Sequence, residues 1–65
     1  MKFRKVQNVY LFSKFVREDG EFTIESDTIY VNGKYKDCFT VTDREGNIVE
    51  RMQRLKDAKA KYENA

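Results

Sequence analysis

The residue types that most often carry out catalysis are scarce in this chain of 65 residues, which has no histidine and a single cysteine, Cys38. Without histidine there is no common general base at neutral pH and no Ser/His or Cys/His pair. Cys38 lies within an expected strand, where a small buried residue is the simpler interpretation. Neighbouring carboxylates occur only in turn-like surroundings, where acidic residues are common for structural reasons: Glu18 with Asp19, Glu25 with Asp27, and Asp43 with Glu45. We therefore expect no catalytic residues and no enzyme activity.

The same composition argues against a bound metal or cofactor. Structural zinc sites need several cysteine and histidine ligands, and neither an EF-hand spacing nor a glycine-rich phosphate loop occurs in the sequence. A single cysteine also excludes a disulfide within the chain. We expect no metal, no cofactor and no small-molecule substrate.

Basic side chains are spaced so that a sheet and a following helix would present them to nucleic acid. Lys34 and Lys36 alternate on one expected strand and Arg51 lies on the next, which places them on a face that can enter a major groove. Four further basic residues could reach the phosphate backbone: Arg54, Lys56, Lys59 and Lys61. Three aromatic residues could stack on single-stranded bases: Tyr30, Tyr35 and Phe39. The alternative is that these aromatics form the core and the lysines are a solvated outer face.

Apolar side chains exceed what one face of a small sheet can bury, since the chain has five Phe and four Tyr. A single helix covers one face, yet apolar residues occur at both parities in residues 9–16 and 22–31. Exposed aromatic surface often marks an interface. We expect a protein partner to contact Tyr10, Phe12, Ile29 and Val31. The alternative is a strongly twisted sheet that curls and buries both parities.

Three glycines set the positions of the turns that hold these residues. Gly20, Gly33 and Gly46 are 13 residues apart, and each lies in a polar segment. Glycine supplies the positive φ of hairpin turns, so the spacing predicts a β-meander. Asn32-Gly33 predicts a type I′ turn that places Tyr30 opposite Tyr35.

The expected fold class is α+β, an antiparallel meander of four to five strands with one C-terminal helix packed on one face, in a single domain. The strands are expected at about 9–17, 22–31, 34–43 and 47–53, and the helix at about 54–63. A stripe of Leu55, Ala58 and Tyr62 would dock the helix on the sheet. The expected core is Phe15, Phe22, Ile24, Tyr35, Phe39, Val41, Val49, Met52, Leu55, Ala58 and Tyr62.

Two segments leave alternatives open. Residues 1–8 are expected to be an irregular or strand-like lead-in to the first strand, and the alternative for the N-terminal segment is a buried helix that ends at Gly20. Between Glu25 and Asp27 the apolar residues change parity, which suggests a bulge or a tight bend.

Residues 39–59 resemble a hairpin-plus-helix pattern of short phage and mobile-element proteins of Gram-positive bacteria. They are also similar to the arm-type DNA-binding domain of tyrosine integrases, in which three strands precede a helix. The resemblance rests on five structural positions, Asp43, Gly46, Met52, Leu55 and Ala58. The integrase domain usually has a Thr or Ser helix cap, where this chain has Gln53 or Arg54, and a more basic sheet. The resemblance implies the fold and a phage or mobile-element origin, and it identifies no site.

The whole chain carries a net charge of +2, less than a dedicated nucleic-acid-binding protein usually has. We expect a cytoplasmic protein with no membrane segment. The expected function is that of a non-enzymatic interaction protein, encoded by a phage or mobile element, which binds and modulates a host macromolecule such as a nuclease or defence protein. The alternative is a double-stranded DNA-binding module, and a homodimer also stays open.

Overall fold

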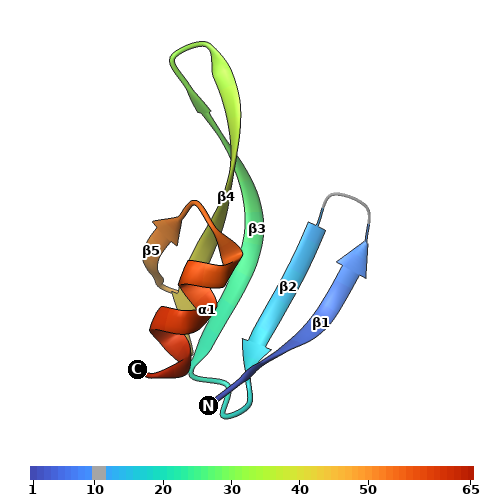
Figure 1. The fold of residues 1–65 in the computed structure, drawn as a ribbon, viewed down its shortest axis with the longest axis vertical. Helices are drawn as coiled ribbons and strands as arrows, with labels where there is room; N and C mark the ends of the chain where they lie inside the picture. Colours follow the sequence, from blue (N-terminus) through green and yellow to red (C-terminus); the bar gives the residue numbers. More distant parts are fainter. Residues whose placement is uncertain (10–11) are drawn as a thin grey trace.

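The computed structural model describes residues 1–9 and 12–65. Within these residues, five strands form one antiparallel sheet in chain order, and one helix follows (Figure 1). The elements are β1 (Phe3–Val9), β2 (Phe12–Arg17), β3 (Phe22–Val31), β4 (Lys34–Asp43), β5 (Ile48–Met52) and α1 (Leu55–Glu63). The expected α+β meander with a C-terminal helix is confirmed.

The N-terminal segment contains two strands, where the sequence predicted an irregular or strand-like lead-in and one strand at about 9–17. Residues 3–9 form a strand of their own, β1, which pairs antiparallel with β2. The register shifts by one residue between Lys5 and Gln7, so Val6 is an extra residue that forms a bulge. The bulge changes the parity of the side chains, which is why the apolar residues fit neither one strand nor one helical face. The alternative of an N-terminal helix is wrong.

The turns follow the glycines. All three glycines have positive φ, as expected, and at the β3–β4 turn both Asn32 (φ 52°) and Gly33 (φ 78°) do. Positive φ at both central residues is the requirement of a type I′ turn. The predicted pairing of Tyr30 with Tyr35 is confirmed.

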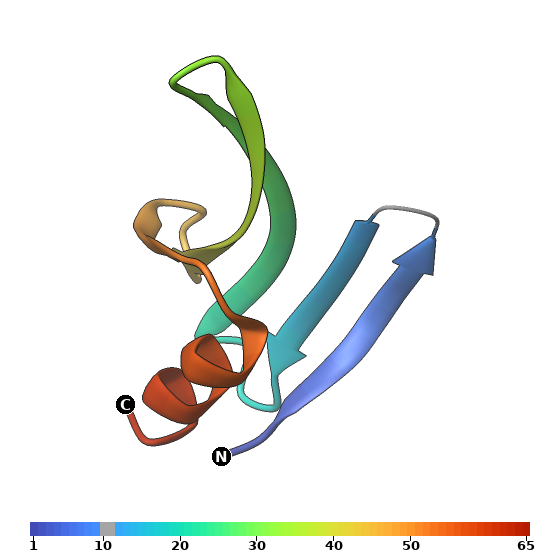
Figure 2. The same ribbon diagram turned by 45° about the horizontal axis from the view of Figure 1, so that its top comes forward.

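The β3–β4 hairpin is longer than its neighbours, and this replaces the expected bulge near Glu25. Its ten residue pairs run without any shift in register. β2 pairs with β3 only as far as Glu25, and β5 pairs with β4 only as far as Phe39. Residues 27–38 are therefore a two-stranded extension, called the ribbon below, that protrudes from the sheet (Figures 1 and 2). The change of apolar parity falls where the ribbon begins and both of its faces become largely exposed.

One row of side chains across the sheet forms the core. Phe15, Ile24 and Val41 lie opposite one another on adjacent strands, and Ala58 and Tyr62 of α1 pack on them. Five half-buried residues surround this cluster: Phe3, Phe22, Phe39, Met52 and Leu55.

Two of the predicted core residues are wrong. Tyr35 is 76% exposed because it lies on the ribbon, beyond the reach of the core. Val49 is 44% exposed because it is an extra residue at a second register shift, where Glu50 pairs with Val41 and Ile48 with Thr42. The other predicted core positions are buried or half-buried.

A buried arginine holds the C-terminal end of α1 against the sheet. The Arg17 guanidinium donates hydrogen bonds to the main-chain oxygens of Tyr62 (3.0 Å) and Ala65 (2.7 Å). It also donates to both carboxylate oxygens of Asp19, at 2.8 and 2.6 Å, and lies 4.8 Å from the centre of the Phe22 ring. The last carbonyls of a helix have no partner within the helix and carry its negative dipole end, so a cation is favourable there.

A second polar contact joins α1 to β5. One carboxylate oxygen of Glu50 accepts hydrogen bonds from the Tyr62 hydroxyl (2.5 Å) and from the Lys61 ammonium (2.6 Å). The helix start has no comparable contact, since Arg54 is the N-cap residue and its side chain makes no capping hydrogen bond. Arginine is a poor N-cap residue, so α1 starts weakly and depends on its docked side chains.

Candidate functional site

The sheet has one face covered by α1 and one open face, and strand register assigns each side chain to a face. The covered face contains the core row that runs from Phe15 to Val41. The adjacent rows project from the opposite side, because successive strand residues alternate. They are Arg4–Val16–Thr23–Thr42–Ile48 and Gln7–Lys14–Glu25–Thr40–Arg51. These rows form the open face together with Phe12, which has the parity of Lys14 on β2, and with the ribbon residues of the same parity, Asp27, Ile29, Val31, Lys34, Lys36 and Cys38.

The open face is positively charged. Its five basic side chains, Arg4, Lys14, Lys34, Lys36 and Arg51, outnumber its two carboxylates, Glu25 and Asp27, for a net charge of +3. Lys14 pairs loosely with Glu25 at 4.0 Å. Among the described residues, no ion pair involves the other four basic side chains. The face therefore has several cations available for a negatively charged partner.

The predicted nucleic-acid-binding residues divide into two groups. Lys34, Lys36 and Arg51 lie together on the open face, and all three are exposed. The others lie elsewhere. Lys59 points to the covered face, where its ammonium is 4.5 Å from the centre of the Phe15 ring. Arg54 and Lys56 are exposed at the start of α1, and Lys61 is paired with Glu50.

The aromatic residues proposed for base stacking do not join the lysines. Tyr30 and Tyr35 have the opposite parity in the ribbon, and their rings contact each other with centroids 5.0 Å apart at an angle of 65°. Phe39 packs half-buried against the core. The ribbon therefore carries its lysines on one side and its tyrosines on the other.

Two basic residues of the open face were not predicted from the sequence, Arg4 and Lys14. Lys14 lies two residues before Val16 on β2, so the alternation of side chains along a strand could have placed Lys14 on the open face. Arg4 could not be placed without the bulge at Val6, because the shift in register decides which side chains of β1 join which face.

Three of the four predicted protein-binding residues, Phe12, Ile29 and Val31, lie on the same open face. Phe12 is 60% exposed and Val31 is 36% exposed, whereas Ile29 is half-buried. Tyr10 lies outside the described residues. The alternative of a curled sheet that buries both parities holds only in part, because Cys38 and Thr40 of the open face are buried whereas Phe12 and Ile48 stay exposed. The basic residues Lys34, Lys36 and Arg51 thus share one surface with these three apolar residues.

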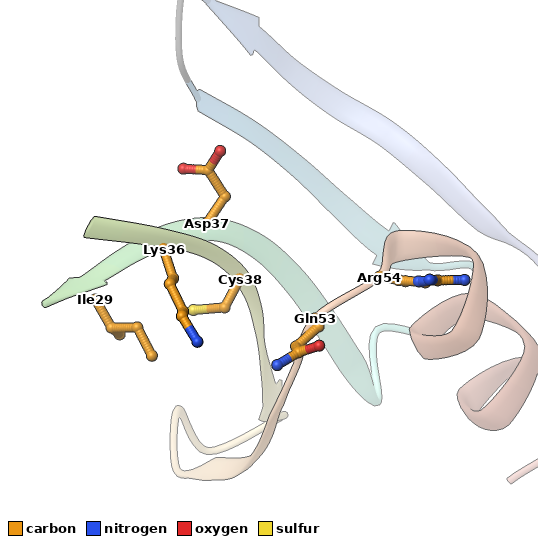
Figure 3. Close-up of a pocket in the computed structure, with 6 residues that line it drawn as sticks. All are labelled: Ile29, Lys36, Asp37, Cys38, Gln53 and Arg54. Atoms are coloured by element: carbon orange, nitrogen blue, oxygen red, sulfur yellow. The ribbon is translucent and has the colours of Figure 1, made fainter. Parts of the chain in front are cut away.

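A pocket of about 390 Å³ lies at the base of the ribbon. In Figure 3, Ile29, Lys36, Cys38 and Gln53 point into one space, whereas Asp37 points to the other side of the strands. Arg54, the sixth lining residue, points toward α1. Burial, followed by the nearby Asp27 carboxylate, raises the pKa of the Cys38 thiol. A raised pKa keeps the thiol protonated and weakens it as a nucleophile.

The carboxylates with shifted pKa values have structural partners. The hydrogen bonds from Arg17 lower the pKa of Asp19 to about 2. Hydrogen bonds from Lys61 and Tyr62 lower the pKa of Glu50, while burial and Glu50 raise the pKa of Tyr62 to about 12. The Asp43 carboxylate, from the third carboxylate pair, accepts hydrogen bonds from the backbone N–H groups of Glu45 (3.0 Å) and Asn47 (2.9 Å). Among the described residues, no cluster of ligands could hold a metal ion.

Membrane spanning by α1 is ruled out by its length of nine residues, and no helix in the described part of the chain has the length and apolar character to cross a bilayer. No family model, curated protein or solved structure matches this chain.

Proposed function

We propose that this protein is a small non-enzymatic module that binds double-stranded DNA through the open face of its sheet. One observation carries the proposal: the face that α1 leaves uncovered has a net charge of +3, and four of its basic side chains are unpaired among the described residues. DNA presents a dense line of phosphates, and neutralising them releases counterions, so such a face gains affinity without a specific sequence.

The arrangement of the charges suits a duplex. Arg4 lies on the edge strand β1 and Arg51 on the opposite edge strand β5, so their long side chains flank the face. Between them, the central strands carry the hydroxyl groups of the half-buried residues Thr23 and Thr42. Edge arginines can contact phosphates on the two sides of a groove, while hydroxyl groups at the centre can hydrogen-bond to base edges.

A titration of fluorescently labelled random duplex DNA tests the proposal. We expect a Kd in the micromolar range at low salt and a log–log salt slope that is clearly negative. Arg4→Ala and Arg51→Ala should each make the slope shallower by about 1. Lys56→Ala is the matched control, because Lys56 is exposed on α1 and not on the open face. Absence of binding at low salt would contradict the proposal.

A protein partner is the second candidate function, and the exposed apolar residues of the open face favour it. Phe12 and Ile48 are both more than half exposed, and Val31 is also exposed. A host nuclease or defence protein fits the phage-like pattern of residues 39–59. This candidate requires capture of a partner from a host lysate that Phe12→Ser and Val31→Ser abolish and that Arg4→Ala leaves intact. Capture that Arg4→Ala abolishes, and that Phe12→Ser and Val31→Ser leave intact, would indicate that the face binds a polyanion.

A further inference from the structure

Within residues 1–9 and 12–65, the ribbon has no neighbouring strand, although it continues the open face. Pairing with β2 ends at Glu25 and pairing with β5 ends at Phe39, so among these described residues the strand segments of 27–38 pair only with each other (Figures 1 and 2). For an isolated hairpin, the conformational entropy lost on folding costs more free energy than the small buried area returns. The ribbon therefore needs contacts of its own to stay ordered.

Several contacts keep the ribbon in one conformation. The register is unbroken to the type I′ turn at Asn32-Gly33, and the Tyr30 and Tyr35 rings pack edge to face across the strands. At the base, the Thr40 hydroxyl donates to the Asp27 carboxylate at 3.3 Å. The ribbon is therefore organised before any partner arrives, which lowers the entropic cost of binding.

The two sides of the ribbon differ in charge. On the side that continues the open face, Lys34 and Lys36 are exposed next to Val31 and Ile29, and no ion pair involves either lysine in the part of the chain that the structure describes. Lys36 also points into the pocket toward Gln53 (Figure 3). Lysine and glutamine are side chains that read guanine and adenine edges in the major groove.

The dimensions of the ribbon match a major groove. Two strands about 4.8 Å apart, with side chains on both sides, fill a groove about 12 Å wide, and a two-stranded ribbon is one of the elements that this groove admits. We infer that the ribbon enters the major groove of the duplex that the open face binds, with Lys34 and Lys36 toward the bases and phosphates. This inference rests on the proposed DNA binding.

Two ribbon variants test the inference in the same titration. Lys34→Ala combined with Lys36→Ala should weaken binding by roughly eight-fold per lysine at about 0.1 M salt, as expected for the loss of one phosphate contact each. The second variant deletes Ile29, Tyr30, Tyr35 and Lys36, which shortens the ribbon by two residue pairs and keeps both the turn and the alternation. Lys36→Ala is its charge-matched control, and the shortened ribbon should bind more weakly than this control.

Competition with groove-specific compounds identifies the groove. Methyl green, which occupies the major groove, should displace the wild-type protein, whereas the minor-groove compound distamycin should not. The shortened variant should lose most of its sensitivity to methyl green. Circular dichroism of each variant shows whether the sheet is retained, and the surface lysine variants alter no core residue.

The outcomes separate the two proposals. If the wild-type protein binds duplex DNA but both ribbon variants bind equally well, or if distamycin alone competes, the ribbon inference is overturned and DNA binding by the open face stands. If the wild-type protein does not bind duplex DNA at low salt, both proposals are overturned. Weakened binding by both variants, together with competition by methyl green, supports the ribbon in the major groove.

Discussion

Arg17 shows how one residue can join three parts of a small fold. Its guanidinium contacts Asp19 in the following turn, the Phe22 ring on the next strand, and two carbonyls at the C-terminal end of the chain. Nothing in the sequence singled out Arg17 as a structural residue. Its partners could not be predicted, because Tyr62 is 45 residues away and its contribution is a main-chain oxygen that any residue would provide.

The Arg17–Asp19 pair predicts a loss of stability in acid. The pKa of Asp19 is about 2 in the folded protein, below the ordinary value of 3.8, so the folded state favours the ionised carboxylate. Its contribution is complete above about pH 4 and is lost as the pH falls toward 2. Asp19→Asn should be less stable at neutral pH and should lose this part of the acid dependence. Urea unfolding at a series of pH values measures it, with Glu18→Gln as the control; an unchanged acid profile in Asp19→Asn would contradict the assignment.

The Tyr62 hydroxyl predicts the opposite dependence at alkaline pH. The pKa of Tyr62 is raised from 10.0 to about 12, so its contribution is complete below about pH 10 and is lost as the pH rises through 12. Tyr62→Phe should cost about 1–2 kcal/mol at neutral pH, because it removes a hydrogen bond to a charged group. It should also remove the late phase of tyrosine ionisation in an ultraviolet titration. Persistence of that phase in Tyr62→Phe would assign it to another tyrosine.

Among the strands and the helix, the predictions from sequence were most accurate where neighbouring residues determine the local structure. Asn32-Gly33 determines its own turn type, and β3 and β4 have the bounds expected from it. The bulges at Val6 and Val49 could not be predicted, because each depends on how a neighbouring strand pairs. The parity change near Glu25 was read as a bulge, although it reflects the end of the flanking strands. Such lateral limits are set by tertiary packing and are not encoded locally.

The ribbon should behave as a locally stabilised element. Replacing Tyr30 and Tyr35 by serine removes their cross-strand contact and should cost roughly 0.2–1 kcal/mol. Because both rings are largely exposed, the loss should be confined to residues 27–38. Amide hydrogen exchange should accelerate there while β2 and β5 stay protected. Faster exchange throughout the sheet would show that the pair supports the whole fold.

In the whole molecule, the candidate site is the open face of the sheet, and only some of the residues on this face could be predicted from the sequence. Alternation correctly grouped Lys34 with Lys36, and the expected strand order placed Arg51 nearby. The register of the Asn32-Gly33 hairpin also placed Val31 opposite Lys34. The sequence could not show that Phe12 shares this face, since that needs the register between β2 and β3 as well. The sequence assigned Lys59 to the nucleic-acid-binding residues, but the side chain of a helical residue beside the sheet can turn toward the sheet, and Lys59 does so.

The stability of the whole molecule should depend on the single row of core residues on the covered face. Ile24 is 0% exposed at the centre of this row, and Ile24→Ala should cost about 2–5 kcal/mol. A domain of this size commonly has only about 3–5 kcal/mol in total, so the variant should be largely unfolded at room temperature.

Ile29→Ala is the matched control, because it makes the same deletion on the same strand at a half-buried position of the ribbon. It should cost less than about 1 kcal/mol and leave one cooperative transition. Thermal and urea unfolding followed by circular dichroism compare the two variants. Because the core row joins β2, β3 and β4 to α1, loss of Ile24 should abolish sheet and helix signals together. A helix signal that persists in Ile24→Ala would show that α1 is held by its polar contacts with Arg17 and Glu50 and not by the core row.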